Sequence, residues 1–164
     1  MSDMTVERAR ELLDYDPLTG SLTWKVRRSK TAIAGSTAGC LTRFGYWKVV
    51  VDGRQYYAHR LAWLIVNGEW PTNQIDHKNG VRTDNRIVNL RDVTRITNNE
   101  NRRLPESCNK LGILGVFKSQ GCKNFCAQIK IKGKSIHLGS FPSTQEAHAA
   151  YLEAKRQHHQ GCTI

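Results

Sequence analysis

The sequence lacks any long apolar run: its longest strongly apolar stretch, residues 61–66, is far shorter than the about 20 residues that a membrane span needs. The N-terminus has no basic region followed by an apolar one, as a secretion signal would. An odd number of cysteines, five, does not indicate a disulfide framework. We therefore expect a cytoplasmic protein that binds no membrane and keeps its thiols reduced.

A second pair of zinc ligands is also missing. Cys122 and Cys126 have a spacing that is weakly typical of zinc sites, but a structural zinc ion usually needs four nitrogen or sulfur ligands at characteristic spacings. No other pair in the chain completes such a set. We expect no structural zinc.

Acidic residues are scarce, with 14 Asp and Glu against 25 Lys and Arg among 164 residues, so the net charge is +11. Residues 107–164 hold eight basic and two acidic side chains and are the most basic part. A strongly basic globular chain indicates a polyanionic partner, usually nucleic acid. Solvated surface lysines and arginines are the plainer alternative. The length suits one medium domain or two small ones.

Local patterns predict small elements in the first hundred residues. Residues 5–13 have the apolar spacing of a short helix, and residues 59–67 that of a short buried helix. Two β-prone runs flank Asp52 and Gly53, which predicts a tight hairpin. The basic segment 27–45 has no periodicity and predicts a long loop with little regular structure.

The C-terminal part has the pattern of three strands followed by one helix. The strands are expected at residues 115–118, 124–131 and 135–138, and Ser143 with Glu146 forms a capping box for the helix. Because side chains alternate along a strand, one face packs on the helix and the other is polar and cationic. The inward residues are Ala127, Ile129, Ile131, Ile136 and Leu138, and the outward residues are Gln128, Lys130, Lys132, Ser135 and His137.

Four polar positions, Asp76, His77, Asn89 and Asn98, mean little one at a time, and an isolated Asp-His pair is more often a surface turn. With their surroundings they resemble the HNH, or ββα-metal, endonuclease family. The matching runs are His59-Arg60-Leu-Ala-Trp, Gly68-Glu-Trp-Pro71, Ile75-Asp76-His77-Lys-Asn-Gly80, Asp84-Asn85-Arg86, Asn89-Leu90 and Thr97-Asn98-Asn99, and the likeness reaches back to Tyr15-Asp16-Pro17.

This resemblance implies a divalent metal site. Asp76 and Asn98 would hold the ion through oxygen atoms, which suit Mg²⁺, or Mn²⁺, better than zinc. By the same resemblance His77 is the general base and Asn89 holds the site and the base in place. The family's last motif position is often His, whereas this chain has Asn98, and Asn99 beside it is an alternative ligand. For His59, which precedes a helix, a structural hydrogen-bonding role is preferred.

Residues 112–160 resemble an AP2-type DNA-binding domain, in which a three-stranded sheet packs on one helix. The likeness rests on Gly112-Ile-Leu-Gly115-Val116, Phe125-Cys-Ala127-Gln128-Ile129-Lys130, Gly133-Lys134-Ser-Ile136-His137-Leu138-Gly139-Ser-Phe141, Glu146-Ala147 and Ala149-Ala150-Tyr151. Such a sheet can enter the major groove, with lysines on phosphates and Gln on base edges. This chain has Phe117, Gln128 and Lys130 where plant-type members often carry Arg, Glu and Arg, so their target sequence does not transfer.

Together these patterns predict an α+β protein: an HNH domain over residues 1–104 with its ββα-metal core at about 70–103, a linker at 105–111, and an AP2-type domain over 112–164. The combination resembles free-standing phage homing endonucleases, acting on double-stranded DNA in a bacterial host as a monomer or a transient dimer. The alternative is a non-catalytic DNA-binding regulator with a decayed nuclease domain. The expected DNA contacts are Phe117, Lys118, Gln128, Lys130, Lys132, Lys134, His137, Arg82, Arg86 and Arg102.

Overall fold

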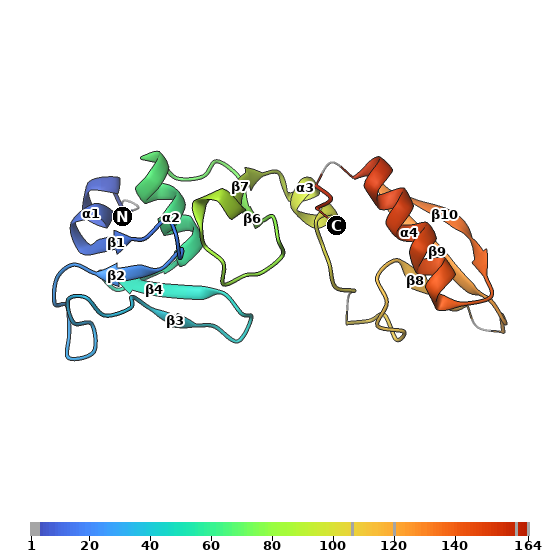
Figure 1. Cartoon of the computed structure of the whole chain (residues 1–164), viewed down its shortest axis with the longest axis horizontal. Coiled ribbons are helices and arrows are strands. Elements are labelled where there is room, and N and C mark those ends of the chain that lie inside the picture. Colours follow the sequence, from blue (N-terminus) through green and yellow to red (C-terminus); the bar gives the residue numbers. More distant parts are fainter. Residues whose placement is uncertain (1–3, 106, 120, 160, 164) are drawn as a thin grey trace. The chain divides into compact units, whose positions relative to one another are not determined.

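The computed structural model describes residues 4–105, 107–119, 121–159 and 161–163, which form helices and several small antiparallel sheets (Figure 1). Contacts divide the chain into two compact units, Met1–Thr94 and Arg95–Ile164. This division falls ahead of the domain boundary at residue 104, which stays a prediction.

The first unit, as far as it is described, joins two α-helices to three small sheets. Its sheets have the strand orders β1-β2, β3-β4-β5 and β6-β7, all antiparallel. The elements are α1 (Val6–Leu12), β1 (Leu13–Tyr15), β2 (Leu22–Trp24), β3 (Cys40–Leu41), β4 (Trp47–Val51), β5 (Arg54–Tyr57), α2 (Ala58–Asn67), β6 (Gln74–His77), the 3₁₀ helix η1 (Ile87–Asn89) and β7 (Leu90–Val93).

The expected helices and hairpin of this unit are present. Asp52 and Gly53 join β4 to β5 with positive φ angles of 48° and 76°, the conformation that a two-residue hairpin turn requires. The basic segment 27–45 is not wholly irregular, because β3 pairs with β4 through Cys40 and Leu41. A strand of two residues forms through backbone pairing with its neighbour and is too short to show a side-chain period, so the sequence pattern does not predict it.

Helix α2 links the main core of the first unit to the β6–β7 hairpin. Its buried Leu61 and Leu64 belong to the large cluster that contains residues of α1 and β4. The neighbouring Ala62 packs instead with Ile75 of β6 and Leu90 of β7. The hairpin is thereby fixed against a helix that is itself held in the core.

The second unit contains α3 (Arg95–Glu100), β8 (Val116–Phe117), β9 (Phe125–Ile131), β10 (Lys134–Phe141) and α4 (Thr144–His158). The strands form one antiparallel sheet in the order β10-β9-β8, and α4 packs on it. Ser143 caps α4, because its side-chain oxygen accepts a hydrogen bond of 3.2 Å from the amide of Glu146. The predicted arrangement of three strands on one helix is therefore present.

One inward residue of this sheet is less buried than its direction suggests. Ala127 and Ile129 are buried against α4 as expected, but Ile136 is 43% exposed. Ile136 pairs with Ile129 across the sheet and so points to the helix side. It lies on the edge strand β10, outside the buried clusters, and the register shifts between His137 and Gly139.

The described residues contain neither a membrane-spanning helix nor a disulfide bond. None of their helices is both long enough and apolar enough to span a membrane. All five cysteines are described, and none of them forms a disulfide bond. Cys126 is buried beside the Ser140 hydroxyl, 3.5 Å from it, whereas Cys122 is exposed.

Candidate active site

Asp76 and His77 end strand β6 and are both buried. Asp76 lies opposite Arg91 in the hairpin and His77 opposite Leu90, so the two side chains leave opposite faces of the strand. The Asp76 Oδ2 atom accepts hydrogen bonds from Arg91 at 2.7 Å from Nη2 and 2.8 Å from Nε. One dipeptide therefore supplies a carboxylate and an imidazole to different surroundings.

The imidazole of His77 is held by Asn85. Its Nε2 atom lies 3.1 Å from the side-chain oxygen Oδ1 of Asn85. Because an amide oxygen only accepts hydrogen bonds, Nε2 donates, and the lone pair of the neutral ring lies on Nδ1. Burial lowers the pKa of His77, against the opposing effect of the Asn85 hydrogen bond and of Asp76. The neutral ring is thus favoured near neutral pH, which is the state that accepts a proton.

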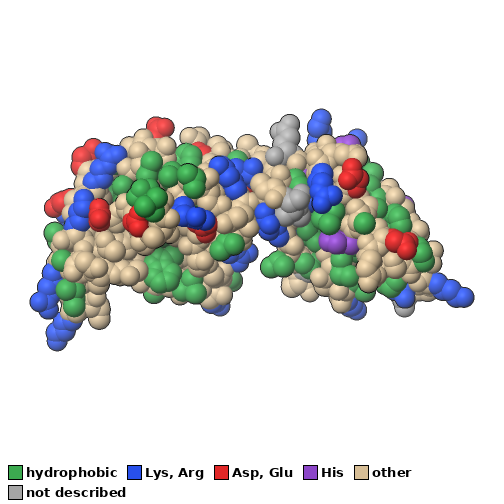
Figure 2. Space-filling model, viewed as in Figure 1, with side chains coloured by type: hydrophobic (Ala, Val, Ile, Leu, Met, Phe, Trp, Pro, Cys, Tyr) green, Lys and Arg blue, Asp and Glu red, His purple; other side chains and the backbone are tan. Residues whose placement is uncertain are grey.

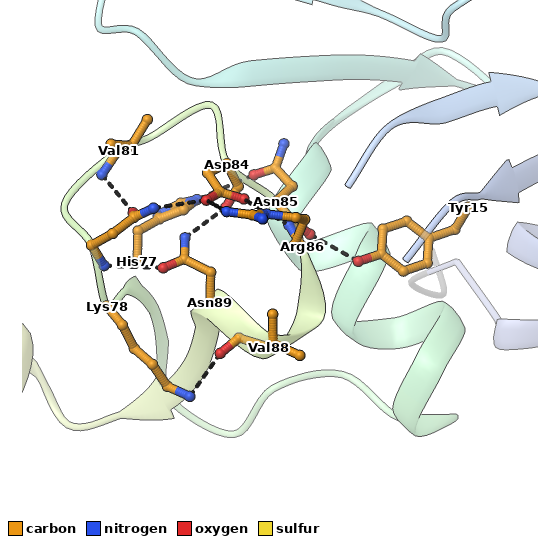
Figure 3. Close-up of polar contacts among 10 residues, drawn as sticks. Tyr15, His77, Lys78, Val81, Asp84, Asn85, Arg86, Val88 and Asn89 are labelled. Carbon is orange, nitrogen blue, oxygen red and sulfur yellow. Dashed lines mark hydrogen bonds and ion pairs between the residues drawn. The ribbon is translucent and has the colours of Figure 1, made fainter. Parts of the chain in front are cut away.

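Asn85 is in turn fixed by the N-terminal part of the first unit. The Tyr15 hydroxyl donates to the Asn85 backbone oxygen at 2.9 Å, and Figure 3 shows Tyr15 approaching this loop from a different part of the chain. Gly20 also lies against it: a Cβ atom there would be 2.4 Å from the backbone nitrogen of Arg86. Only glycine fits so close to the backbone, so the position of Asn85 depends on the Tyr15–Gly20 turn.

The side-chain hydrogen bonds of Asn89 brace the same loop and go to its backbone, not to the imidazole. Its Oδ1 atom accepts from the amide of Asn79 at 3.0 Å, and its Nδ2 atom donates to the backbone oxygen of Asp84 at 2.8 Å (Figure 3). Asn85, rather than Asn89, therefore touches the candidate base. Sequence reasoning missed Asn85 as a site residue, although Asp84-Asn85-Arg86 belongs to the HNH-like pattern.

The two arginines expected to bind DNA in this unit are already engaged. Arg86 donates to the Asp84 carboxylate at 2.6 and 2.7 Å, and this contact lowers the pKa of Asp84 to about 2. Arg82 donates to the Phe44 backbone oxygen at 2.7 Å and lies over the Tyr46 ring, 5.0 Å from its centre. Arg82 and Arg86 stay predicted DNA contacts. Tyr46, Tyr57 and His59 form an aromatic group beside the ring of His77, and Arg82 lies over the Tyr46 member of it.

His59 belongs to this aromatic group. Its ring stacks on that of Tyr57, with 5.4 Å between the ring centres. It meets the ring of His77 edge-on, with 5.2 Å between the centres. The Nδ1 atom is buried and has no hydrogen-bond partner among the described residues. Burial lowers the pKa of His59 to about 3, so the ring is neutral. Nδ1 of His59 therefore does not supply the structural hydrogen bond that was expected of this residue. The packing of its ring against Tyr57 and His77 holds the side chain in place.

Asn98 and Asn99 lie on α3, which the contacts assign to the second unit. Asp76 and Asn98 as joint metal ligands therefore stay a prediction. The donor chemistry fits a hard divalent cation, since a carboxylate and an amide oxygen leave several of six places for water and phosphate. Within the described ranges, no group of three or more His, Cys, Asp and Glu residues is placed to hold a metal ion.

The second unit brings several predicted DNA contacts together. A cleft of about 780 Å³ is lined by residues of α3, of the segment after it and of the sheet, among them Arg102, Phe117, Gln128, Lys130 and Lys132. His137 pairs with Gln128, so both share the sheet face that points away from α4. Lys134 opens β10 and is exposed.

Lys118 departs from this set, because its ammonium group lies 5.0 Å from the centre of the Phe125 ring. In the view of Figure 2, basic side chains are scattered among acidic ones and do not form one continuous field. Gln128 and Lys130 at the cleft stay predicted contacts with DNA.

Part of the chain matches a known protein family. A family model described as HNH endonuclease matches residues 56–100, a span that includes α2, the β6–β7 hairpin and α3. No curated protein and no solved structure matches the chain. The match supports nuclease activity with DNA as the substrate, and HNH nucleases generally use a divalent metal ion. It ends before β8, so the AP2 and homing-endonuclease resemblances stay predictions.

Proposed function

We propose that this protein is a metal-dependent endonuclease that hydrolyses phosphodiester bonds of double-stranded DNA at or near a site bound by its second unit. The observation that carries the proposal is His77: a buried, neutral imidazole, oriented through Nε2 by Asn85, inside the segment that matches the HNH model. A base of this kind must keep its lone pair available near neutral pH.

In this proposal His77 accepts a proton at Nδ1 from the attacking water, while Asn85 keeps the ring from turning. Asp76 and Asn98 hold a divalent cation, most simply Mg²⁺, through oxygen atoms. Such a cation, when bound, stabilises the negative charge that develops on the phosphate and the leaving oxygen. One such site per chain favours nicking by a monomer, or double-strand cleavage when two chains act.

The second unit supplies affinity and site preference. Its outward sheet face presents Gln128 and Lys130 beside the cleft, and side chains of this type contact base edges and phosphates. A nuclease that carries its own DNA-binding unit fits a homing-type enzyme encoded by a phage or prophage. DNA binding without any cleavage would contradict this proposal. It would favour the alternative, a non-catalytic DNA-binding regulator with a decayed nuclease domain.

Plasmid cleavage tests the proposal. The purified protein is expected to convert supercoiled DNA into the open circular form in Mg²⁺ and not in EDTA. His77→Ala should slow cleavage by roughly 10²–10⁴-fold, the range for loss of a general base, with little change in DNA affinity. His158→Ala, at the exposed end of α4, is the matched control and should cleave normally. Cleavage by His77→Ala at the wild-type rate would refute the assignment of the base.

A further inference from the structure

The last residues of the chain lie directly on α3. The Gly161 amide donates to the Glu100 carboxylate at 3.1 Å. A Cβ atom at Gly161 would be 2.1 Å from the backbone oxygen of Thr97, so the two backbones touch. Residues 161–163, called the C-terminal tail below, therefore pack on the last turn of the helix that carries Asn98.

The tail also binds the residues that follow α3. The Thr163 hydroxyl donates to the side-chain oxygen of Asn101 at 2.5 Å. Arg103 donates through Nη2 to the Thr163 hydroxyl at 2.8 Å and to its backbone oxygen at 3.1 Å. Asn101 is buried although the surface helix before it is not. These contacts fix the residues that directly follow the C-terminal end of α3.

A buried lysine completes the arrangement. Lys155 of α4 is only 1% exposed, and its ammonium group donates to the backbone oxygen of Arg102 at 2.5 Å. Burying a lysine is costly unless its charge is hydrogen-bonded. Lys155 thus ties α4, and with it the sheet, to the backbone just beyond α3.

Helix α3 needs such support. It has six residues, fewer than two turns, and none of them is buried. Isolated helices shorter than about 12 residues are marginal in water, and most helices in proteins are stabilised by an apolar face that packs on a core. Since no residue of α3 is buried, the polar contacts from Lys155 and the C-terminal tail support its end.

We propose that Lys155 and the C-terminal tail are positioning groups for Asn98: they keep α3 folded so that its asparagine presents a ligand oxygen during cleavage. The inference rests on the proposed function and holds equally if Asn99 is the ligand, because both residues lie on α3. Its consequence is that the second unit takes part in cleavage itself and does not merely bind DNA.

Two variants test the inference in the full-length protein. Lys155→Met removes the ammonium group and keeps an unbranched side chain of similar size, and Gly161→Ala pushes the tail from α3 without changing α4. Arg156→Met is the control: it removes the same charge from the adjacent, exposed position of α4, where Arg156 makes only a loose contact of 3.8 Å with Glu153.

Amide hydrogen exchange is the readout that does not depend on activity. Amides from Asn98 to Arg102 are expected to exchange at least about tenfold faster in both test variants than in the wild type. Amides of β9 should be unchanged, which also shows that the second unit remains folded. The Arg156→Met control should exchange like the wild type. Wild-type protection of α3 in both test variants would overturn the inference.

Cleavage kinetics supply the second readout. Both test variants should require about tenfold more Mg²⁺ for half-maximal cleavage, the scale found when a group that orients a metal ligand is lost. Excess Mg²⁺ should restore part of the rate, and DNA affinity should match that of Arg156→Met. An unchanged Mg²⁺ requirement would overturn the positioning role.

The two proposals fail in different ways. If the wild-type protein shows no Mg²⁺-dependent cleavage, the proposed function is wrong, and the exchange experiment still reports whether the tail holds α3. If His77→Ala is inactive while Lys155→Met and Gly161→Ala behave as the wild type in exchange and in metal requirement, the proposed function stands and the inference about the tail is wrong.

Discussion

The loop between β6 and β7 and the helix α3 belong to one sequence pattern, but they are held in place by different means. In the loop, His77 contacts Asn85 eight residues away, and Asn79 contacts Asn89 ten residues away. Helix α3 and the residues after it are contacted by Lys155 and by the C-terminal tail, 53 to 62 residues further along the chain. The side-chain hydrogen bonds around the base are thus short in sequence and the N-terminal part supports their loop through Tyr15 and Gly20, whereas the helix of the predicted metal ligand is contacted from the far end of the sequence.

The largest effect is expected at α3 itself. Asn98→Ala should abolish cleavage at low Mg²⁺, by more than about 10²-fold, because loss of metal stabilisation costs several kcal/mol. Excess metal should recover part of the rate, since Asp76 remains. Asn99→Ala is the neighbouring control and should cleave normally. If Asn99→Ala is inactive and Asn98→Ala is active, the ligand is the next residue along the helix.

Within the β6–β7 loop, Asn85→Ala should slow cleavage by about 10²-fold, since a misplaced catalytic group costs about that much. The imidazole of His77 would lose the acceptor for Nε2. Asn85→Asp keeps an acceptor but adds a negative charge, which raises the pKa of His77. In that variant the rise of the rate with pH should move to higher pH. An identical pH profile in wild type and Asn85→Asp would show that Asn85 does not act through His77.

The sheet of the second unit offers a further contrast, between reading and holding DNA. Gln128→Ala should relax preference at one base pair, at a cost of roughly 1–3 kcal/mol if its amide makes a bidentate contact. Lys130→Ala should weaken binding to all sequences and make the salt dependence shallower by about 0.9 in the log–log slope. Titrations of specific and random duplexes at several salt concentrations measure both. Equal losses on both duplexes for Gln128→Ala would contradict its role in reading sequence.

The smallest effect concerns acid stability of the β6–β7 loop. The folded pKa of Asp84 is lowered to about 2, chiefly by Arg86, and lies below the ordinary value. The contact therefore stabilises the first unit at pH values above the ordinary pKa of about 4, and this contribution is lost as pH falls through about 2. Urea unfolding between pH 5 and pH 2 should show a steeper decline for the wild type than for Asp84→Asn. Parallel curves would show that the Asp84–Arg86 pair adds nothing.

The sequence by itself determined the elements that depend on local rules. Asp52 and Gly53 mark a hairpin turn because few residues adopt positive φ at low cost, and Ser143 marks a helix start because its side chain satisfies an open amide. The burial of Ala127 and Ile129 follows from the two-residue period of a strand. The HNH-like pattern likewise named the segment that the family model matches.

Only the tertiary structure decided which groups meet across the chain. That Asn85 rather than Asn89 reaches His77 depends on the path of a loop whose position Tyr15 and Gly20 fix from far along the sequence. The exposure of Ile136 follows from the edge position of β10, which alternation does not reveal. Lysine is normally a surface residue, yet Lys155 is buried, and a backbone oxygen 53 residues away accepts a hydrogen bond from its ammonium group. Such contacts follow from how the chain closes on itself, and no local period or turn rule encodes that closure.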